Sequence, residues 1–483
     1  MEILFWIGLI FGIGYFFGKS KPSKNNPIPG TISPYSSNTT NYPTRPRLNV
    51  KKTDLSNITL SGEQQAIFEL IEGTNANAYV TGKAGTGKSI LLQYFVENTK
   101  KNTAVVAPTG VAALNVGGQT IHSFFRLAPE LQDLSTLQVD YKTREILRHL
   151  DILVIDEISM VRADLMEAIN RKLQLGRGNN LPFGGLQVVM FGDLFQLPPV
   201  VTDGQLRRYF DHNYGGIYFF NAPVYRQTTL KVLELRHIFR QKDEEFKELL
   251  NAVRSGHHTE QVLARLNERL NVTVPASGFI TLAGHNTTVS RINHLRLERL
   301  QGREKVYIAD IIGDIKESSF PTEKELKLKV GAQVMLLKND RQKPSRWVNG
   351  TLGIVARLND DTVHVNIDGI EHSISKETWD SVRYYYDPGQ RKLEREITSS
   401  FTQFPLRLAW AVTIHKSQGQ TYQSVGIDLS DGAFAHGQTY VALSRCQSLD
   451  GLYLISPIKS EDIIVDQEII EFMRRVEQVK YIS

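Results

Sequence analysis

From residue 60 onward, the chain alternates between short apolar runs and longer stretches with the spacing of helices. The apolar runs are rich in β-branched residues and have the continuous hydrophobicity of buried strands. Seven of them lie at 103–107, 151–155, 187–191, 231–235, 279–282, 424–428 and 451–455. Such strands, alternating with helices, predict parallel sheets covered by helices on both faces. Because the runs are too many for one such sheet, we expect an α/β protein with two α/β domains.

The pattern changes between about residues 330 and 402, where apolar and polar positions alternate between closely spaced turns. Strands are expected there at 334–337, 352–355 and 363–366. This alternation indicates a small antiparallel β-barrel inserted into the second α/β domain. We therefore expect the first domain at 56–228 and the second at 229–483, with the barrel at about 330–402.

The N-terminal segment 3–18 has no charged residue and is rich in aromatic and aliphatic side chains. As a helix it would span about 24 Å, slightly less than the bilayer core of about 30 Å. We interpret residues 1–18 as a transmembrane anchor helix rather than a buried core helix. A secretory signal peptide would need a basic start and a small-residue cleavage site, which this segment lacks. Three lysines follow it, so the body is expected on the cytoplasmic side of a membrane, or soluble in the cytoplasm if the segment is not inserted.

Positive charge is concentrated near the N-terminus. Residues 1–53 hold seven Lys/Arg and one acid, so the rest of the chain holds 49 basic and 50 acidic groups. Residues 19–55, with many prolines and polar residues, are expected to form a flexible basic linker. This linker could contact anionic lipid or nucleic acid, or be a solvated tether. Nucleic-acid binding by the near-neutral body would require a local groove.

Composition is that of a globular protein, with 41% hydrophobic and 22% charged residues. At 483 residues the chain is too long for a single core. The single cysteine, Cys446, excludes an intrachain disulfide and fits a reducing compartment.

A glycine-rich loop stands between an expected strand at 77–81 and an expected helix from residue 90. Its pattern, G-x-x-x-x-G-K-S, is that of a triphosphate-binding loop, whose backbone N–H groups converge on phosphate oxygens. Lys88 would reach the β/γ-phosphates, and the Ser89 hydroxyl would bind Mg²⁺. The expected ATP-binding residues are Gly82, Lys83, Ala84, Gly85, Thr86, Gly87, Lys88 and Ser89.

Two further strand ends carry candidate catalytic groups. Asp156 and Glu157 follow the apolar run 152–155. Asp156 would hold Mg²⁺, and Glu157 would orient and deprotonate the attacking water. Gln196 follows the run 187–191, where an amide can sense the γ-phosphate.

Two arginines are candidates for a contact with the γ-phosphate across a cleft. Arg240 and Arg445 both fall in the expected second α/β domain. A guanidinium that reaches the nucleotide from a second domain acts as an arginine finger. Each alone could be a surface ion-pair residue, but together with the phosphate loop they favour a nucleotide held between two domains.

Polar groups also follow other strands. Thr109 and His122 lie beyond the run 103–107, and His415 and Lys416 lie in a polar loop after residue 414. Such groups suit phosphate and sugar contacts along a single nucleic-acid strand. His122 could equally be a structural histidine.

These motifs, in this order, closely resemble the Pif (petite integration frequency) family of superfamily-one 5′→3′ DNA helicases. The resemblance runs from about residue 60 to 455 and includes LSGEQ at 60–64. The family's own signature corresponds to a helix at 164–173 followed by PFGGLQ at 182–187. LKLKVGAQVM at 326–335, NGT at 349–351 and LAWAVTIHKSQG at 408–419 also match. Residues 174–181 inside the signature receive no role, and the N-terminal segment is not part of the family pattern.

The resemblance implies two RecA-like domains that bind ATP between them, with Gln64 reading the adenine. It also implies single-stranded DNA near Thr109, His122, His415 and Lys416, and a duplex-splitting wedge at about 126–145. The expected function is ATP-dependent 5′→3′ unwinding of tailed or forked duplex DNA in replication, repair or recombination. The alternatives are a RecD-like subunit that works only inside a complex, and a membrane-tethered DNA-dependent ATPase.

Overall fold

A computed structural model of the chain describes residues 59–479, apart from 129–130, 202–203, 242, 276–278, 316, 341, 343–345, 388–391 and 476–477. The expected anchor at 1–18 and linker at 19–55 lie outside the described residues. Within the part that is described, no helix has both the length and the apolar character needed to cross a bilayer.

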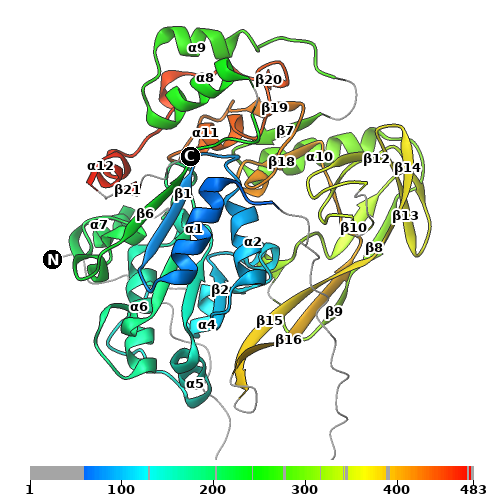
Figure 1. The fold of residues 1–483 in the computed structure, drawn as a ribbon. Helices are drawn as coiled ribbons and strands as arrows, with labels where there is room; N and C mark the ends of the chain where they lie inside the picture. The colour runs from blue at the N-terminus through cyan, green and yellow to red at the C-terminus, as the bar shows by residue number, and fades with distance from the viewer. Residues whose placement is uncertain are drawn as a thin grey trace, which may run out of the picture. The chain divides into compact units, whose positions relative to one another are not determined.

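A parallel sheet of seven strands organises the first α/β domain (Figure 1). Residues of β1 alternate between its two faces, so that Tyr79 packs in one hydrophobic cluster and Val80 in another. Both faces are buried, which explains why its central strands are continuous apolar runs. The order is β21-β6-β1-β5-β4-β2-β3, with β1 at Ala78–Gly82, β2 at Thr103–Ala107, β3 at Gln119–Thr120, β4 at Ile152–Ile155, β5 at Gln187–Phe191, β6 at Lys231–Leu235 and β21 at Gln478–Val479.

Helices cover both faces of this sheet. Helices α1 (Gly62–Gly73) and α2 (Lys88–Asn98) pack on the face of Val80. Helices α5 (Tyr141–His149) and α6 (Ala163–Arg177) pack on the face of Tyr79. Helices α3, α4 and α7 span Gly110–Asn115, Ile121–Phe125 and Gly204–Asn213.

The second α/β domain contains a parallel sheet in the order β18-β7-β19-β20. Its apolar residues form a second core with helices α8, α9 and α11. The strands are β7 at Ile280–Ala283, β18 at Ala411–Thr413, β19 at Val425–Asp428 and β20 at Leu452–Leu454. The helices are α8 at Glu244–Ser255, α9 at Glu260–Asn267, α10 at Asn286–Arg299 and α11 at Gln438–Leu443.

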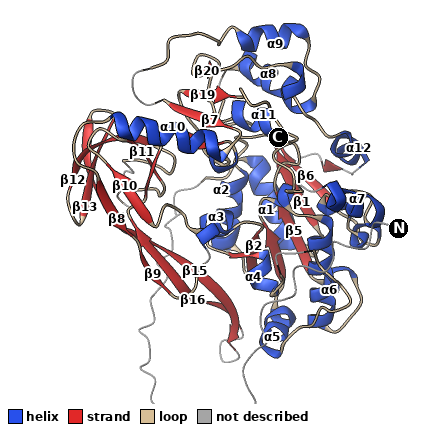
Figure 2. Cartoon of the chain, turned by 180° about the vertical axis from the view of Figure 1, so that it is seen from behind, coloured by secondary structure: helices blue, strands red, loops and turns tan. Residues whose placement is uncertain are grey.

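The insertion between β7 and β18 is larger than the single barrel expected at about 330–402. Three separate antiparallel sheets form within it, and the long strands β15 and β16 can be followed in Figure 2. The expectation failed because alternation identifies a half-buried strand but not its partner strand. The sheets are β10-β8 (Glu325–Leu328, Lys305–Ile308), β14-β13-β12-β11-β17 (Ile370–Ser375, Thr362–Ile367, Leu352–Leu358, Gln333–Leu336, Leu406–Leu408) and β15-β16-β9 (Glu377–Asp387, Lys392–Gln403, Asp310–Ile312).

The division at 228/229 also needs correction, because β6 pairs with β1 inside the first sheet. The C-terminal helix α12 (Gln467–Arg475) returns to the first domain as well. Its Ile469 is buried in that core, and its Phe472 ring stacks on Phe220 at a centroid distance of 4.0 Å. The second domain is therefore inserted between β6 and α12. An apolar run such as 231–235 does not reveal which sheet it joins, because that depends on pairing with residues far along the chain.

Candidate nucleotide site and DNA interface

The glycine-rich loop connects β1 to α2, as the sequence predicts. Gly85 and Gly87 have φ values of 86° and 80°, in the left-handed region that favours glycine. A Cβ at Gly85 would lie 2.4 Å from the Cβ of Arg240, so a larger residue would push the two segments apart. Lys88 Nζ donates to the carbonyls of Gly82 at 2.7 Å and Lys83 at 3.1 Å. Burial lowers the pKa of Lys88, and a phosphate could replace the two carbonyls to which its ammonium donates.

Two carboxylates stand at the end of β4 beside this loop. Burial, together with the charge of Glu157, raises the pKa of Asp156 to about 7. Burial also raises the pKa of Glu157, partly offset by the charges of Lys88 and Arg445. Glu157 has a φ of 50°, a conformation that costs a non-glycine residue about 1–3 kcal/mol and is common at functional sites. The local geometry thus holds two poorly solvated acids next to a phosphate-binding loop.

A cavity of about 820 Å³ joins the loop, the acids and both arginines. This volume lies within the range of small-molecule sites, about 300–1,000 Å³. Residues of both α/β domains line it: Ala84, Gly85, Thr86, Gly87, Lys88, Ser89, Ile90, Asp156, Glu157, Gly192, Gln196, Phe239, Arg240, Asp243, Gly419, Thr421, Arg445, Gln447 and Ser448.

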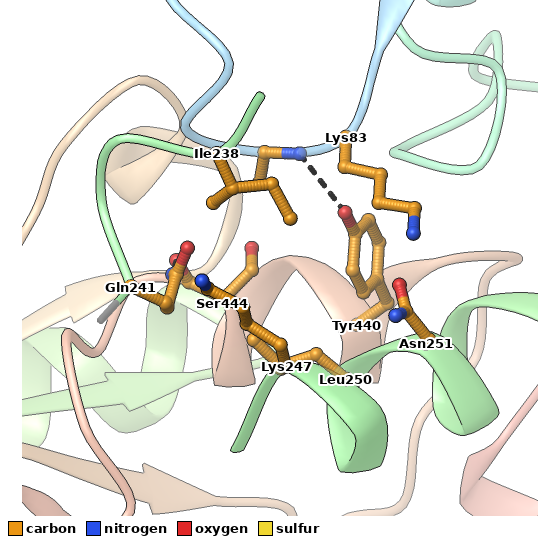
Figure 3. A pocket seen from close by; sticks show the side chains of 9 residues that line it. Lys83, Ile238, Gln241, Lys247, Leu250, Asn251, Tyr440 and Ser444 are labelled. Carbon is orange, nitrogen blue, oxygen red and sulfur yellow. Dashed lines mark hydrogen bonds between the residues drawn. The ribbon is translucent and has the colours of Figure 1, made fainter. Parts of the chain in front are cut away.

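Three predicted nucleotide residues do not line this cavity. Gly82 ends β1, while Gln64 lies against the loop and donates to the Gly87 carbonyl at 3.3 Å. The side-chain oxygen of Gln64 accepts from the Ser61 N–H at 2.9 Å, so its amide also caps α1. Lys83 lines a smaller neighbouring pocket (Figure 3).

The two arginines differ in origin from the expectation. Arg240 lies in the loop after β6, a strand of the first domain's sheet, whereas Arg445 follows α11 of the second domain. Burial and the like charge of Arg445 lower the pKa of Arg240 to about 9. The Arg445 side chain donates to the Val441 carbonyl at 2.9 Å and the Ser444 hydroxyl at 2.8 Å, and the residue is only 1% exposed. Both guanidiniums line the cavity and donate to carbonyl or hydroxyl oxygens rather than carboxylates.

Gln418, which the sequence places in the polar loop after residue 414 with other candidates for nucleic-acid contact, bridges the two domains. Its side-chain amide donates to Glu157 Oε2 and to Gln196 Oε1, both at 3.1 Å. Gln418 follows the short 3₁₀ helix that contains His415 and Lys416. The sequence indicated a polar loop here, but no local signal predicts a bond to residues more than 200 positions away.

The phosphate loop and the β5 end are also held by the second domain. The Ala84 N–H donates to the Tyr440 hydroxyl at 3.0 Å, which Figure 3 marks with a dashed line. Arg254 of α8 lies 2.9 Å from Asp193 and 3.9 Å from the centroid of the Phe195 ring. Burial alone would raise the pKa of Asp193, but the charges of Arg254 and Lys88 outweigh it and lower the pKa. Relative movement of the domains would therefore disturb both nucleotide-facing segments.

The four predicted DNA residues lie beyond the carboxyl ends of strands in both sheets. Thr109 follows β2 and accepts from the Ala112 N–H at 3.2 Å as the N-cap of α3. His122 lies in α4, directly after β3. His415 and Lys416 follow β18, and burial lowers the pKa of each. The structure places these residues at the edges where α/β sheets bind ligands, while DNA contact stays a prediction.

The signature residues hold α5 and α6 together. The expected helix is part of α6, and Asn170 Oδ1 accepts from the Phe183 N–H at 2.8 Å. Arg177, in the stretch 174–181 that received no role, donates to the carbonyls of Leu147 at 2.8 Å and Leu150 at 2.9 Å. The stretch thus secures the end of α5 just before β4 and the two carboxylates that follow it.

One cavity is lined by the phosphate loop, by the acidic end of β4 and by an arginine of the second domain. This combination is typical of nucleotide-binding α/β proteins. A family model described as PIF1-like helicase matches residues 59–263, and one described as DNA helicase Pif1, 2B domain, matches 314–358. The chain belongs to this helicase family. The family expected from the ordered motifs is confirmed.

Individual proteins that are similar to this chain belong to the same helicase family. The ATP-dependent DNA helicase Pif1 of Bdellovibrio bacteriovorus is 34% identical over 432 residues, which cover 87% of this chain and 93% of that protein. The ATP-dependent DNA helicase PIF1 of Danio rerio is 36% identical over 435 residues, 86% of this chain but 64% of that longer protein. A crystal structure of Pif1 from Bacteroides sp with ADP-AlF4 has a TM-score of 0.80 at 39% identity, and the match covers 86% of this chain and 97% of that one. These relatives support the expected class of enzyme and its nucleotide.

Proposed function

We propose that this chain is an ATP-dependent 5′→3′ DNA helicase that moves along single-stranded DNA and unwinds tailed or forked duplexes during replication, repair or recombination. The observation that carries the proposal is the cavity between the two α/β domains, which brings the phosphate loop, Glu157 and Arg445 together. Hydrolysis in such a cleft changes the contacts between domains. Both domains also carry candidate DNA-binding residues. A change in the contacts between the domains could therefore move the protein along a DNA strand.

The chemical step uses groups of both domains. Lys88 and the N–H groups of the loop bind and orient the phosphates, and Lys88 exchanges its carbonyl partners for phosphate oxygens. Ser89 and Asp156 are oxygen ligands that suit Mg²⁺, which usually combines one or two protein groups with phosphates and water. An ion held there would neutralise phosphate charge. Glu157 accepts the proton of the attacking water, a role helped by its raised pKa.

The two arginines complete the cleft. Arg445 and Arg240 supply planar donors for charge that develops on the transferred phosphoryl group. Because Arg445 comes from the second domain, it reaches the nucleotide only when the domains are close together. Its contribution would therefore depend on domain closure.

Gln418 links this chemistry to the DNA side. It donates to Glu157 and Gln196 and follows His415 and Lys416 in the chain. A strand bound by His415 and Lys416 would shift this turn and with it the orientation of the Glu157 carboxylate. We assign Gln418 as a positioning residue that makes water activation depend on DNA.

The DNA path is proposed to pass Thr109 and His122 on the first domain and His415 and Lys416 on the second, with residues 126–145 as the wedge. The hydrophobic segment 3–18 supports a membrane anchor on sequence grounds alone, which would place the helicase on the cytoplasmic face of a membrane.

A directional unwinding assay tests the proposal. Duplexes with a 5′ or a 3′ single-stranded tail are incubated with the full chain, ATP and Mg²⁺. The 5′-tailed duplex should be unwound and the 3′-tailed one should not. The Glu157→Gln variant is the matched control and should unwind neither. Preference for the 3′ tail would contradict the polarity, and ATP hydrolysis without unwinding of either substrate would contradict helicase activity.

A further inference from the structure

Three aromatic rings form a cluster at the carboxyl edge of the second sheet. The Phe434 ring lies 4.9 Å from the His285 ring at an interplanar angle of 34°. The His415 ring lies 6.4 Å from the Phe434 ring at an interplanar angle of 16°. Phe434 is 55% exposed, and His285 is exposed as well. An exposed ring that lies next to two imidazoles differs from an isolated exposed phenylalanine, because its neighbours restrict its orientation while part of its surface stays open to solvent.

The three rings come from three neighbouring strands. β18, β7 and β19 are neighbours in the second sheet (Figure 1). They pair in parallel so that Thr413 and Asp428 both stand opposite Ala283. His415 and His285 each follow their strand end by two residues, and Phe434 lies in the loop after β19. The carboxyl ends of adjacent parallel strands are where open α/β sheets bind ligands. The cluster therefore occupies a ligand-binding edge rather than an arbitrary surface.

The chemistry of the cluster selects the ligand. Burial lowers the pKa of His415, so its ring can act as a neutral aromatic surface. Lys416, next in the chain, carries a positive charge on the same short turn as His415. Flat aromatic faces with a nearby cation suit a nucleic-acid strand whose unpaired bases stack while its phosphates contact the lysine.

We propose that Phe434, supported by His285 and His415, is a stacking platform for one unpaired base of the single-stranded DNA that the second domain holds. This inference rests on the proposed function and identifies Phe434 as a residue that contacts a base by stacking. A single stacked base would give the second domain a sequence-tolerant hold on the strand, because every base has an aromatic face.

Binding of two fluorescein-labelled oligonucleotides of equal length tests the platform with the full chain. One is oligothymidine, and the other has the same phosphates but abasic sugars. The variants are Phe434→Leu, which keeps apolar bulk without an aromatic face, and Phe434→Trp, which enlarges the face. Phe434→Leu should weaken oligothymidine binding about tenfold, within the range expected for one stacked base, and leave abasic binding nearly unchanged. Phe434→Trp should bind oligothymidine at least as tightly as the parent chain.

Other results would overturn the platform. If Phe434→Leu weakened the binding of both oligonucleotides equally, Phe434 would act through shape and not through stacking on a base. Unchanged oligothymidine binding by Phe434→Leu would show that the ring is not on the DNA path. Failure of the parent chain to bind either oligonucleotide would contradict the proposed helicase function itself, and the platform would fall with it.

Discussion

The side-chain amide of Gln418 donates to the carboxylate of Glu157 at 3.1 Å, across the cleft between the two α/β domains. The same amide also donates to Gln196 Oε1. One side chain of the second domain thus contacts both the proposed base and the proposed phosphate sensor of the first. This relationship gives the structure a direct connection between the proposed DNA-binding turn and the group that activates water.

Gln418→Ala should lower ATP turnover in the presence of single-stranded DNA by about tenfold, because Glu157 would lose the donor that orients it. The KM for ATP should change little, since Gln418 is not among the residues that line the cavity. Steady-state hydrolysis with and without oligothymidine measures the effect. Gln423→Ala is the matched control, because Gln423 is exposed on the same segment. If Gln418→Ala responded to DNA as the parent chain does, the proposed coupling would be wrong.

Glu157→Gln should bind ATP normally but lose turnover by about 10²–10⁴-fold, because the amide cannot accept the proton of the attacking water. Lys88→Ala should instead lose nucleotide binding, since its ammonium is the group proposed to bind the phosphates. Binding of a fluorescent ATP analogue and steady-state hydrolysis separate the two effects. If Glu157→Gln hydrolysed ATP at a near-normal rate, Glu157 would not be the base that accepts the proton of the attacking water.

Arg445→Ala and Arg240→Ala should each lower turnover by at least about 10²-fold with a smaller change in ATP affinity, because their contacts strengthen in the transition state. Arg357→Ala is the control, since Arg357 lies on β12 of the insertion, away from the cleft. Thermal unfolding should confirm that the Arg445 variant is folded, because this side chain is buried. Normal hydrolysis by both cleft variants would mean that the nucleotide does not sit between the two domains.

The parts of the site that the sequence predicts are those that depend on local order. The loop around Lys88 and the pair Asp156 and Glu157 each require a strand followed by a specific turn, and a few consecutive residues specify that arrangement. Gln418 and Tyr440 act through bonds to residues more than 200 positions away, and no local pattern records such a partner. The run 231–235 likewise predicts a strand but not its partner, and the structure pairs it with β1 of the first sheet.

The hydrophobic segment at 3–18 predicts membrane association. The full chain should sediment with membranes, and a chain without residues 1–53 should not. Leu9→Arg is the sharper variant, because it keeps the basic linker and places a charge near the middle of the segment, at a cost of about 2.5–3.5 kcal/mol in a bilayer. If the Leu9→Arg variant no longer sedimented with membranes, the segment 3–18 would be the part of the chain that binds them. If the parent chain were soluble, or if salt alone released it, the segment would not be an anchor.

The raised pKa of Asp156, about 7, predicts a pH-dependent cost of keeping this carboxyl group in the nucleotide-free cleft. Because the folded-state pKa exceeds the usual value near 4, the folded chain binds this proton more tightly than the unfolded chain. The stabilising contribution is complete below about pH 4 and is lost as the pH rises through 7.

Asp156→Asn should therefore stabilise the nucleotide-free, Mg²⁺-free protein at pH 8, by about 1–2 kcal/mol once partial solvent access is considered. The gain should shrink steadily as the pH falls toward 5, because the wild-type carboxyl group becomes neutral in the folded state. Thermal unfolding of both proteins between pH 5 and 8 measures the trend, and Asp361→Asn, at an exposed position, should show none of it. A gain that was equal at all pH values, or a loss of stability at pH 8, would mean that Asp156 is not an uncompensated carboxylate. The expected trend would show that burial and the neighbouring Glu157 charge disfavour the ionised form of Asp156.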